Sequence, residues 1–483
     1  MDIPLKRIDN YIWEIPMEAS EGMRVPGRIY ADEELLEGMK GDNTLKQCSN
    51  VAHLPGIQRF SITLSDGHQG YGFPIGGVAA TDYDEGVISP GGVGYDINCG
   101  VRLLTTNLTI NEITPRLEDI VSTLFKNVPS GLGSSREKFR LSRNEFLDMV
   151  VEGVNWLIDK GMGRERDSQR CEEWGKMKNA DPDTLSDRAI KRGLAQVGTL
   201  GSGNHFLEVQ KVVKIFDADT AKTFGINDKD QVTVMIHTGS RGFGHQVCSD
   251  YLKIMDRTVS KYNITLPDRE LACAPALSRE GEEYRKAMAC AVNFAFCNRQ
   301  AITHWVRESF EQVFNTSSEE MGLDLIYDVA HNIVKEETHV IDGVNRKVWT
   351  HRKGATRAFP PGSNEIPSEY RSTGQPVLIP GTMGTSSYVL AGTDKSMDLT
   401  FGSTPHGAGR VMSRTAAKKS HWGEDVQIAL RNRGILVMTP STVTLAEEVS
   451  EAYKDVDRVV EVTHSLGIGK KVAQMKPMAV VKG

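Results

Sequence analysis

The sequence predicts an α/β protein, in the broad sense that includes α+β folds, with a mixed β-sheet core and helical insertions. Short apolar runs end directly in polar, glycine-rich turns, as strands do where they open into loops. Two longer stretches, near residues 112–190 and 270–315, read as mostly helical. The sequence shows no internal repeat, low-complexity tract or long linker. We therefore expect residues 1–483 to form one large globular unit.

The strand-like runs share one property, which is that a motif follows each of them. The first lies in a strand-and-turn region over residues 51–105. Ligands in α/β proteins gather where strands end in loops, so this recurrence predicts a site along one edge of a sheet. The runs and the motifs are Ser61–Ser65 before Asp66-Gly-His68, Val232–Ile236 before His237, Leu323–Val329 before His331, and Pro376–Ile379 before Pro380–Ser387.

The helical stretches differ in how much of their surface is apolar. In the first stretch we expect a helix to open at Ser135 and to continue through apolar positions as far as Leu157. The second stretch contains neither glycine nor proline between Glu282 and Phe314 and is apolar on several faces. This pattern predicts a buried helix, either continuous or broken once.

Composition and charge exclude several classes of protein. The chain has no apolar run of about 18 residues, so we expect no membrane span. We also expect no secretory signal at the N-terminus. Seven scattered cysteines without a Cys-x-x-Cys pair argue against a disulfide framework and indicate a reducing, intracellular setting. The net charge of −6 does not indicate a nucleic-acid-binding protein, so a polyanionic substrate would require a local gathering of basic residues.

Five residues in glycine-rich or polar turns form a candidate ligand set for metal ions. The set offers one sulfur, three imidazoles and one carboxylate, which is more than a single tetrahedral zinc needs. A dinuclear site with metals about 3.5–4 Å apart would use all of them. Ligand softness favours zinc, although manganese tolerates such a mixed set when phosphate oxygens join it. Each residue alone is compatible with a structural role, and the candidates are Asp96, Cys99, His205, His237 and His331.

Other segments have the character of phosphate-binding turns, although no Walker A sequence is present. Pro380–Ser387 offers successive backbone N–H groups and several hydroxyls, which suits an anion. His406-Gly-Ala-Gly places an imidazole beside Arg410 and Arg414. A neutral imidazole can attack an activated phosphorus and form a phosphoramidate. We expect Arg241, Arg410 and Arg414 near substrate phosphates, and further basic groups lie at Arg352-Lys353, Arg357 and Lys418-Lys419.

Taken together, these segments resemble the RtcB family of RNA-splicing ligases over nearly the whole chain. The resemblance implies an RtcB-like fold and a cytosolic or nuclear enzyme that joins RNA ends in transfer-RNA splicing and RNA repair, and of the two locations we expect the cytoplasm. One end carries a 2′,3′-cyclic phosphate or a 3′-phosphate and the other a 5′-hydroxyl. It also implies GTP as co-substrate and two Mn²⁺ ions in place of zinc. The motifs that carry it are Asp66-Gly-His68-Gln-Gly, Asp96-Ile-Asn-Cys99, Gly203-Asn-His205-Phe-Leu-Glu208, His237-Thr-Gly-Ser-Arg241, His331-Asn332, His351-Arg-Lys353, Pro380–Tyr388, His406-Gly-Ala-Gly-Arg410 and Val480-Val-Lys482-Gly.

The resemblance also implies roles for individual residues. His406 is similar to the histidine that becomes guanylylated on the way to an RNA 3′-pp-5′-G intermediate. The five candidate ligands are similar to those of two manganese ions, with Cys99 as the bridge. The residues expected to contact substrate phosphates are Asp66, Arg241, Lys353, Arg410 and Arg414. The positions similar to GTP contacts are Asn204, His205, Phe206, Leu207, Glu208, His331, Asn332, Pro380, Gly381, Thr382, Met383, Ser387, His406, Gly407, Ala408, Gly409, Tyr453 and Lys482, and Thr382 keeps the hydroxyl where some relatives have serine.

The implied partners are RNAs with such ends, with transfer-RNA halves as examples, and archease, a small acidic protein. The resemblance further implies a monomer. Two other readings stay open. The first is a dinuclear metal phosphodiesterase that hydrolyses cyclic phosphates without a covalent nucleotide on His406. The second is an RNA-binding scaffold that has lost catalysis and binds RNA with steep salt dependence.

Overall fold

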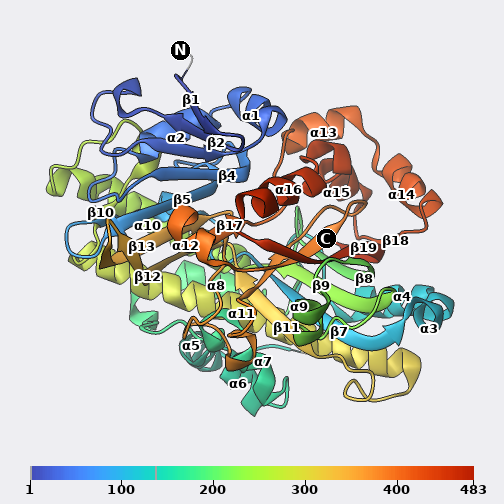
Figure 1. Ribbon diagram of the computed structural model, residues 1–483. Helices are drawn as coiled ribbons and strands as arrows, with labels where there is room; N and C mark the ends of the chain where they lie inside the picture. The colour runs from blue at the N-terminus through green and yellow to red at the C-terminus, as the bar shows by residue number, and fades with distance from the viewer. Residues whose placement is uncertain (1–2, 136–138) are drawn as a thin grey trace.

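The computed structural model describes residues 3–135 and 139–483, and two large β-sheets form its framework (Figure 1). The first sheet has seven strands and contains the N-terminal part of the chain, drawn in blue at the upper left of Figure 1. Only β3 and β4 pair in parallel in this sheet. In spatial order its strands are β1 (Lys6–Asp9), β2 (Ile12–Ile15), β3 (Gly27–Tyr30), β4 (Ser61–His68), β5 (Ile75–Asp82), β13 (Val344–Lys353) and β12 (Asn332–Ile341).

The second sheet has eight strands, with pairs of both directions, so the prediction of an α/β protein with mixed sheets is confirmed. Its strands are β11 (Leu325–Ala330), β7 (Gly100–Thr109), β9 (Gln231–Thr238), β8 (Phe206–Ile215), β19 (Lys470–Lys482), β16 (Ser387–Ala391) and β15 (Pro376–Ile379), with β18 (Leu436–Met438) beside β19. Two short ladders pair β6 (Val87–Ile88) with β10 (Ala274–Pro275) and β14 (Ala355–Arg357) with β17 (Ser403–Pro405).

One residue joins the two sheets at β11 and β12. β11 ends at Ala330 in the second sheet, and β12 begins at Asn332 in the first. His331 is therefore the whole connection. The backbone N–H of His331 donates to the carbonyl of Cys99 at 2.7 Å, which ties the crossing to the segment before β7.

The first helical stretch is mostly helical, but its longest apolar part begins later than expected. Residues 136–138 lie outside the described residues, and Phe139–Ser142 is not helical, so the prediction of a helix from Ser135 is wrong. Ser142 and Glu145 form a capping box, which starts the helix at Arg143. The helices of this stretch are α3 (Ile110–Ile113), α4 (Leu117–Asn127), α5 (Arg143–Glu152), α6 (Val154–Asp159), α7 (Glu165–Gln169) and α8 (Asp187–Leu194).

The second stretch forms α11 (Arg279–Phe314), one continuous helix of 36 residues that is buried along most of its length. The Ser278 hydroxyl caps its start, and Asn315 ends it in the left-handed conformation. Arg299 of α11 donates to the carbonyls of Asn98 and Thr238 at 2.9 Å each. These carbonyls adjoin Cys99 and His237, so the helix supports both segments from behind.

The remaining helices cover the sheets and the C-terminal region, where α13 to α16 cluster at the upper right of Figure 1. None of the helices within residues 3–135 and 139–483 has the length and apolar character needed to cross a bilayer. These helices are α1 (Glu33–Lys40), α2 (Thr44–Val51), α9 (Ala218–Thr223), α10 (Arg241–Lys261), α12 (Asp394–Thr400), α13 (Arg414–Ser420), α14 (Gly423–Asn432), α15 (Thr442–Glu447) and α16 (Val456–Leu466). Short 3₁₀ turns occur at Met17–Ala19, Pro90–Gly92, Thr114–Arg116, Glu172–Gly175, Pro182–Thr184, Arg269–Leu271, Ser368–Tyr370 and Ser450–Ala452.

The apolar core divides along the two sheets. The largest cluster joins α11 and the helices of the first stretch to the second sheet, with Phe146, Phe294 and Val234 among its members. A second cluster fills the space beneath the first sheet, where Leu64 and Val459 belong to it. Each sheet thus has its own apolar support, and the polar residues described below lie between them.

A buried ion pair inside the first sheet explains one basic motif. Arg352 of β13 forms two hydrogen bonds with the carboxylate of Glu337 in β12, at 2.5 and 2.9 Å. His339 lies 2.9 Å from the same carboxylate. Burial alone would raise the pKa of Glu337, but the Arg352 guanidinium and His339 hold it below its usual range. Arg352 therefore has a structural partner and is not free to bind a substrate.

Replacing Arg352 by methionine is expected to lower the free energy of unfolding by about 3–5 kcal/mol at neutral pH, because Glu337 would remain buried without its partner. The pKa of Glu337 is lowered in the folded state, so the pair stabilises the protein above the unfolded pKa and the contribution disappears as the pH falls through the folded pKa. Urea denaturation at neutral pH measures the loss. Arg371→Met, at an exposed site, is the control, and an equal loss in both variants would contradict this account.

Candidate metal and nucleotide site

Three of the candidate ligands form a compact cluster at the ends of two strands of the second sheet. Asp96 and Cys99 occupy a tight turn before β7, in which the Cys99 N–H donates to the Asp96 carbonyl at 2.9 Å. His205 directly precedes β8. One ligand atom from each of Asp96, Cys99 and His205 lies within 4.8 Å of the others. The shortest separation is 2.9 Å, between His205 Nε2 and Asp96 Oδ2.

Two further histidines extend this cluster toward His406. Cys99 Sγ lies 3.3 Å from His237 Nε2 and 3.6 Å from His205 Nε2, so the thiol stands between two imidazoles. The rings of His237 and His331 have their centroids 5.8 Å apart, and the ring of His331 lies 5.3 Å from that of His406. The sequence thus brings five separated motifs into one continuous row of side chains.

The donor atoms of this row fit a divalent cation. His205 Nδ1 lies 3.1 Å from the Leu200 carbonyl, an acceptor, and 3.3 Å from Arg241 Nη1, a donor. When the proton is on Nδ1, His205 Nε2 presents a lone pair beside the Asp96 carboxylate oxygen 2.9 Å away, and these two acceptors can ligate one cation. Likewise, His331 Nδ1 contacts the Thr356 hydroxyl at 2.8 Å, while His331 Nε2 is buried without a partner in the described chain. Metal-binding histidines commonly have such a partner on the other ring nitrogen.

Burial also sets the charge of these groups. Burial lowers the pKa of His205, His237 and His331, so all three imidazoles are neutral at neutral pH, as metal ligands must be. Burial and the Asp96 carboxylate raise the pKa of the Cys99 thiol well above its ordinary value. A bound divalent cation would reverse that effect because it stabilises the thiolate.

His406 is held by Asp66, which comes from the first sheet. His406 follows β17, and its Nδ1 lies 2.5 Å from Asp66 Oδ2, which also accepts from the backbone N–H of His406 at 3.0 Å. A proton on Nδ1 leaves the lone pair on Nε2. Gly409 makes this approach possible, because its φ is +74° and an added Cβ would lie 2.2 Å from the Asp66 carbonyl oxygen. His68 Nδ1 lies 3.0 Å from that same oxygen, and burial lowers the pKa of His68 to about 4.

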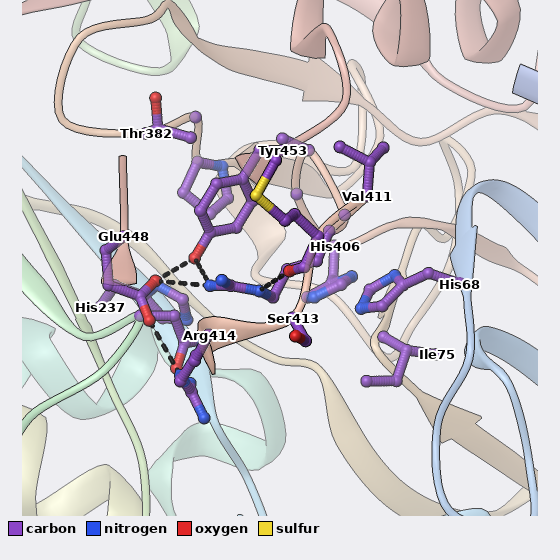
Figure 2. Close-up of a pocket in the computed structure, with 18 of the residues that line it drawn as sticks. His68, Ile75, His237, Thr382, His406, Val411, Ser413, Arg414, Glu448 and Tyr453 are labelled. Atoms are coloured by element: carbon purple, nitrogen blue, oxygen red, sulfur yellow. Dashed lines mark hydrogen bonds and ion pairs between the residues drawn. The ribbon is translucent and has the colours of Figure 1, made fainter. Parts of the chain in front are cut away.

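A cavity of about 640 Å³ opens beside His406 (Figure 2). His68 and Ile75 from the first sheet line it. Twelve of the expected GTP contacts belong to its wall as well: Asn204, Phe206, Pro380, Gly381, Thr382, Met383, His406, Gly407, Ala408, Gly409, Tyr453 and Lys482. His205, His331 and Asn332 instead line a neighbouring cavity. Ser387 lies behind the turn, where its hydroxyl accepts from the Gly381 N–H at 3.1 Å, and Leu207 and Glu208 are buried in β8.

Glu448 is a site residue that the sequence analysis missed. Its carboxylate binds Arg410 at 3.1 Å. It also binds Arg414 at 3.0 Å and accepts a hydrogen bond from the Tyr453 hydroxyl, as dashed lines in Figure 2 mark. Burial opposes ionisation of Glu448, but Lys482 and the two arginines lower its pKa. The sequence carries no signal for this role, because Glu447-Glu448 has the pattern of an exposed helix end.

A second cavity, of about 1000 Å³, contains the metal cluster and shares His406, Asn204 and Arg414 with the first. Arg241 lies in its wall with only 8% of its surface exposed, and its Nε has no partner among the described residues. Lys353 also lines this cavity, but its ammonium group donates to the carbonyls of Tyr71 and Gly91, and burial lowers the pKa of Lys353 to about 8. Arg241 Nε is therefore available to a ligand, whereas the Lys353 ammonium group is engaged by the carbonyls of Tyr71 and Gly91.

The expectation of a site along one edge of a single sheet is wrong. His237 lies in β9 of the second sheet, and Asp96, Cys99 and His205 lie in the turns before its strands β7 and β8. Asp66 instead lies in β4 of the first sheet, and His406 follows the β14–β17 ladder. The chain crosses between the sheets at His331, which places the site between them and not on one edge.

Comparison with known proteins agrees with these motifs. A family model described as tRNA-splicing ligase RtcB matches residues 47–483. The chain is 57% identical over 483 residues to a tRNA-splicing ligase RtcB of Methanococcus maripaludis, and the match covers all of both chains. It is also 57% identical over 481 residues to one of Thermococcus kodakarensis, covering 100% of this chain and 99% of the relative. A third, of Pyrobaculum aerophilum, is 57% identical over 484 residues and is covered completely.

Proposed function

The chain belongs to the RtcB family of tRNA-splicing ligases, and we propose that it uses GTP and manganese to join an RNA 2′,3′-cyclic phosphate or 3′-phosphate end to a 5′-hydroxyl end. As a member of this family it is an RNA ligase. Its substrates would include transfer-RNA halves. Action in the cytoplasm as a monomer, with an archease as accessory protein, remains a prediction from the family resemblance.

The contact between His406 and Asp66 is the observation that carries this proposal. Asp66 holds the Nδ1 proton of His406, so Nε2 is the nucleophilic atom, and His406 stands where the two cavities meet. In the proposed reaction Nε2 attacks the α-phosphorus of GTP, a P–N bond forms, and the bond to the β-phosphate oxygen breaks to release pyrophosphate. The RNA 3′-phosphate then takes the guanylate from His406, and the P–N bond breaks.

The last step joins the two RNA strands. The 5′-hydroxyl oxygen loses its proton and attacks the activated 3′-phosphorus, and guanylate leaves. A cyclic phosphate must first be opened by water to a 3′-phosphate. The buried Arg241, whose Nε is unpartnered in the described chain, would hold one of these phosphates, because a guanidinium binds phosphate through two donors.

Asp96, Cys99, His205, His237 and His331 would hold two manganese ions, with Cys99 between His205 and His237 as the bridge. When bound, the ions would polarise phosphate oxygens and offset the charge that builds up during transfer. The donor set alone suits zinc or manganese, and the family resemblance decides for manganese.

Two buried groups support binding of a guanine base. Burial raises the pKa of Glu208 to about 7, and its Oε1 has no partner among the described residues. Lys482, whose pKa burial lowers to about 8, lines the nucleotide cavity and influences Glu208 electrostatically. A carboxylate suits the adjacent N–H donors of guanine, and the Pro380–Met383 turn would hold phosphates through its backbone N–H groups.

Incubation of the purified protein with GTP labelled at the α-phosphorus and Mn²⁺ tests the proposal. Denaturing electrophoresis should show labelled protein, and mild acid should release the label, because phosphoramidates are acid-labile while phosphate esters of serine are not. Absence of label with Mn²⁺, Zn²⁺ and Co²⁺, with and without an archease, would overturn the guanylylated-histidine mechanism.

Replacing Asp66 by asparagine is expected to slow guanylylation by roughly 10²- to 10⁴-fold, because the amide no longer fixes the tautomer and orientation of His406. Rapid-quench measurement of protein labelling gives the rate, and the dependence on GTP concentration should change little, since Asp66 contacts His406. Asp84→Asn, at an exposed turn of the same sheet, is the matched control. A large rise in the GTP concentration needed for half-maximal rate would contradict this role.

A further inference from the structure

Most basic residues that the motifs offered for RNA binding already have partners. Arg352 is paired with Glu337, and Arg357 lies within reach of Glu172 and Glu173, at 3.8 and 3.4 Å. Arg410 and Arg414 bind Glu448, and Lys353 donates to backbone carbonyls. An acidic protein that binds a polyanion must therefore present other cationic groups near its site.

A third cavity, of about 660 Å³, supplies such groups. It borders the metal-containing cavity, and Tyr71, Tyr95 and Arg192 line both. None of the residues that line it lines the nucleotide cavity. The three hollows thus follow one another in the order nucleotide cavity, metal-containing cavity and third cavity, which we call the outer groove.

The outer groove has an excess of unpaired positive charge. Arg188 and Arg192 project from α8, and Lys253 projects from α10. Within residues 3–135 and 139–483, neither Arg188 nor Lys253 has a carboxylate within 4 Å, and Arg192 binds only the neutral amide of Gln246, at 3.1 Å. The acidic groups of the groove are engaged elsewhere: Asp256 pairs with Arg269 at 2.6 Å, and Glu270 accepts from the backbone N–H of Gly72.

Aromatic rings lie at the junction of the outer groove with the metal-containing cavity. The rings of Tyr71 and Tyr95 meet edge to face with centroids 5.5 Å apart, and Tyr95 lies 6.0 Å from the ring of His245. Tyr95 is 36% exposed and directly precedes the half-buried Asp96. A positively charged groove with exposed aromatic faces is the arrangement that binds single-stranded nucleic acid without regard to sequence.

We propose that the outer groove binds the body of a single-stranded RNA whose end reacts at the metal-containing cavity. The phosphates would lie along Arg188, Arg192 and Lys253, and a base near the end would stack on Tyr95. The proposal rests on the proposed function, because it assumes that RNA ends meet at His406. Either strand has the required chemistry, the one that ends in a 3′-phosphate or the one that begins with a 5′-hydroxyl.

A double charge reversal, Arg188→Glu with Lys253→Glu, tests the proposal in the full-length protein. Both side chains are exposed, and Arg188→Gln with Lys253→Gln serves as a milder pair if the reversal impairs folding. Lys191→Glu is the matched control, because Lys191 is exposed on the same helix α8 but lines none of the three cavities. Ligation is measured with strands of about 4 and about 20 nucleotides, lengthening one strand at a time.

In the double variant, the KM for RNA should rise on the order of 10-fold when one particular strand is lengthened. The KM should change little when that strand is short. The plot of log affinity against log salt concentration should become less steep by about 1–2, because each lost phosphate contact removes about 0.7 from the magnitude of its slope for single strands. The strand whose lengthening reveals the defect is the one in the groove. If the double variant and Lys191→Glu have the same KM for RNA with either strand lengthened, the proposal is overturned.

Two added measurements separate this outcome from a failure of the proposed function. Guanylylation by GTP reports on His406 without RNA. Fluorescence anisotropy with a labelled 20-nucleotide RNA (length on the order of the site sizes of single-strand-binding modules) reports on the groove without catalysis. If wild-type protein is not guanylylated, the mechanism fails, but weaker RNA binding by the double variant still supports the groove. Unchanged RNA binding overturns the groove even when guanylylation succeeds.

Discussion

Replacing His406 by alanine is expected to abolish both labelling by α-labelled GTP and RNA ligation, with a loss on the order of 10⁴-fold or more. The loss should be this large because His406 Nε2 would form the covalent bond, and no other imidazole has a carboxylate on Nδ1 at this junction of the described cavities. GTP affinity should fall far less, because the wall around Met383, Tyr453 and Lys482 remains. Protein labelling, RNA ligation and calorimetric binding of GTP measure the three quantities.

His464→Ala is the matched control, because His464 is exposed at the end of α16 and lines neither cavity. The same variant separates the two other readings from ligation. A metal phosphodiesterase would keep hydrolysing cyclic phosphates after the loss of His406. An RNA-binding scaffold would retain RNA in both proteins without any dependence on GTP. Ligation that survives in His406→Ala would sink the covalent mechanism.

Replacing Cys99 by alanine is expected to weaken manganese binding by roughly 10²-fold or more, since even the loss of groups that only orient metal ligands costs 10- to 100-fold. Cys99 Sγ lies 3.3 and 3.6 Å from two imidazole nitrogens, so its loss removes the donor shared by two positions. The drop in the number of tightly bound ions should be read from calorimetry and from the spin-resonance signal of free Mn²⁺. These readouts do not depend on catalysis.

Cys273→Ala is the matched control for a buried cysteine, since Cys273 is fully buried outside the cluster. It should bind manganese like wild type. Both variants should unfold at similar urea concentrations when no metal is added, because each removes a single buried sulfur. Unaltered manganese stoichiometry in Cys99→Ala would show that Cys99 is a core residue and no ligand.

Local patterns were sufficient to predict the strands and the residues that follow them. The apolar runs before His237 and Pro380 are strands β9 and β15, because a short β-branched run that stops at a polar turn has few alternatives. The buried helix α11 was predictable for a similar reason, since it is apolar on several faces and lacks glycine and proline in its interior. Each of these elements depends mainly on residues close in the chain.

The arrangement of the site was not predictable from such patterns. Glu448 becomes a central carboxylate only because Arg410, Arg414 and Tyr453 converge on it. Arg352 and Lys353 are adjacent and look alike in a basic motif, yet one is paired with a carboxylate and the other braces two carbonyls. Partner choice of this kind depends on contacts between distant segments, which a single sequence does not display.

The single-residue connection at His331 limits how this protein can change length during evolution. Inserting or deleting one residue there would turn the alternate side chains of β12 to the opposite face. An insertion would place Glu336 beside Arg352 instead of Glu337, and a deletion would place Thr338 there. The hairpin between β12 and β13, at the exposed Asp342-Gly343, lies at the far end of the same strand, and we expect it to accept insertions because exposed turns generally do. Length variation among homologous chains should therefore concentrate at this hairpin and spare the crossing between the sheets.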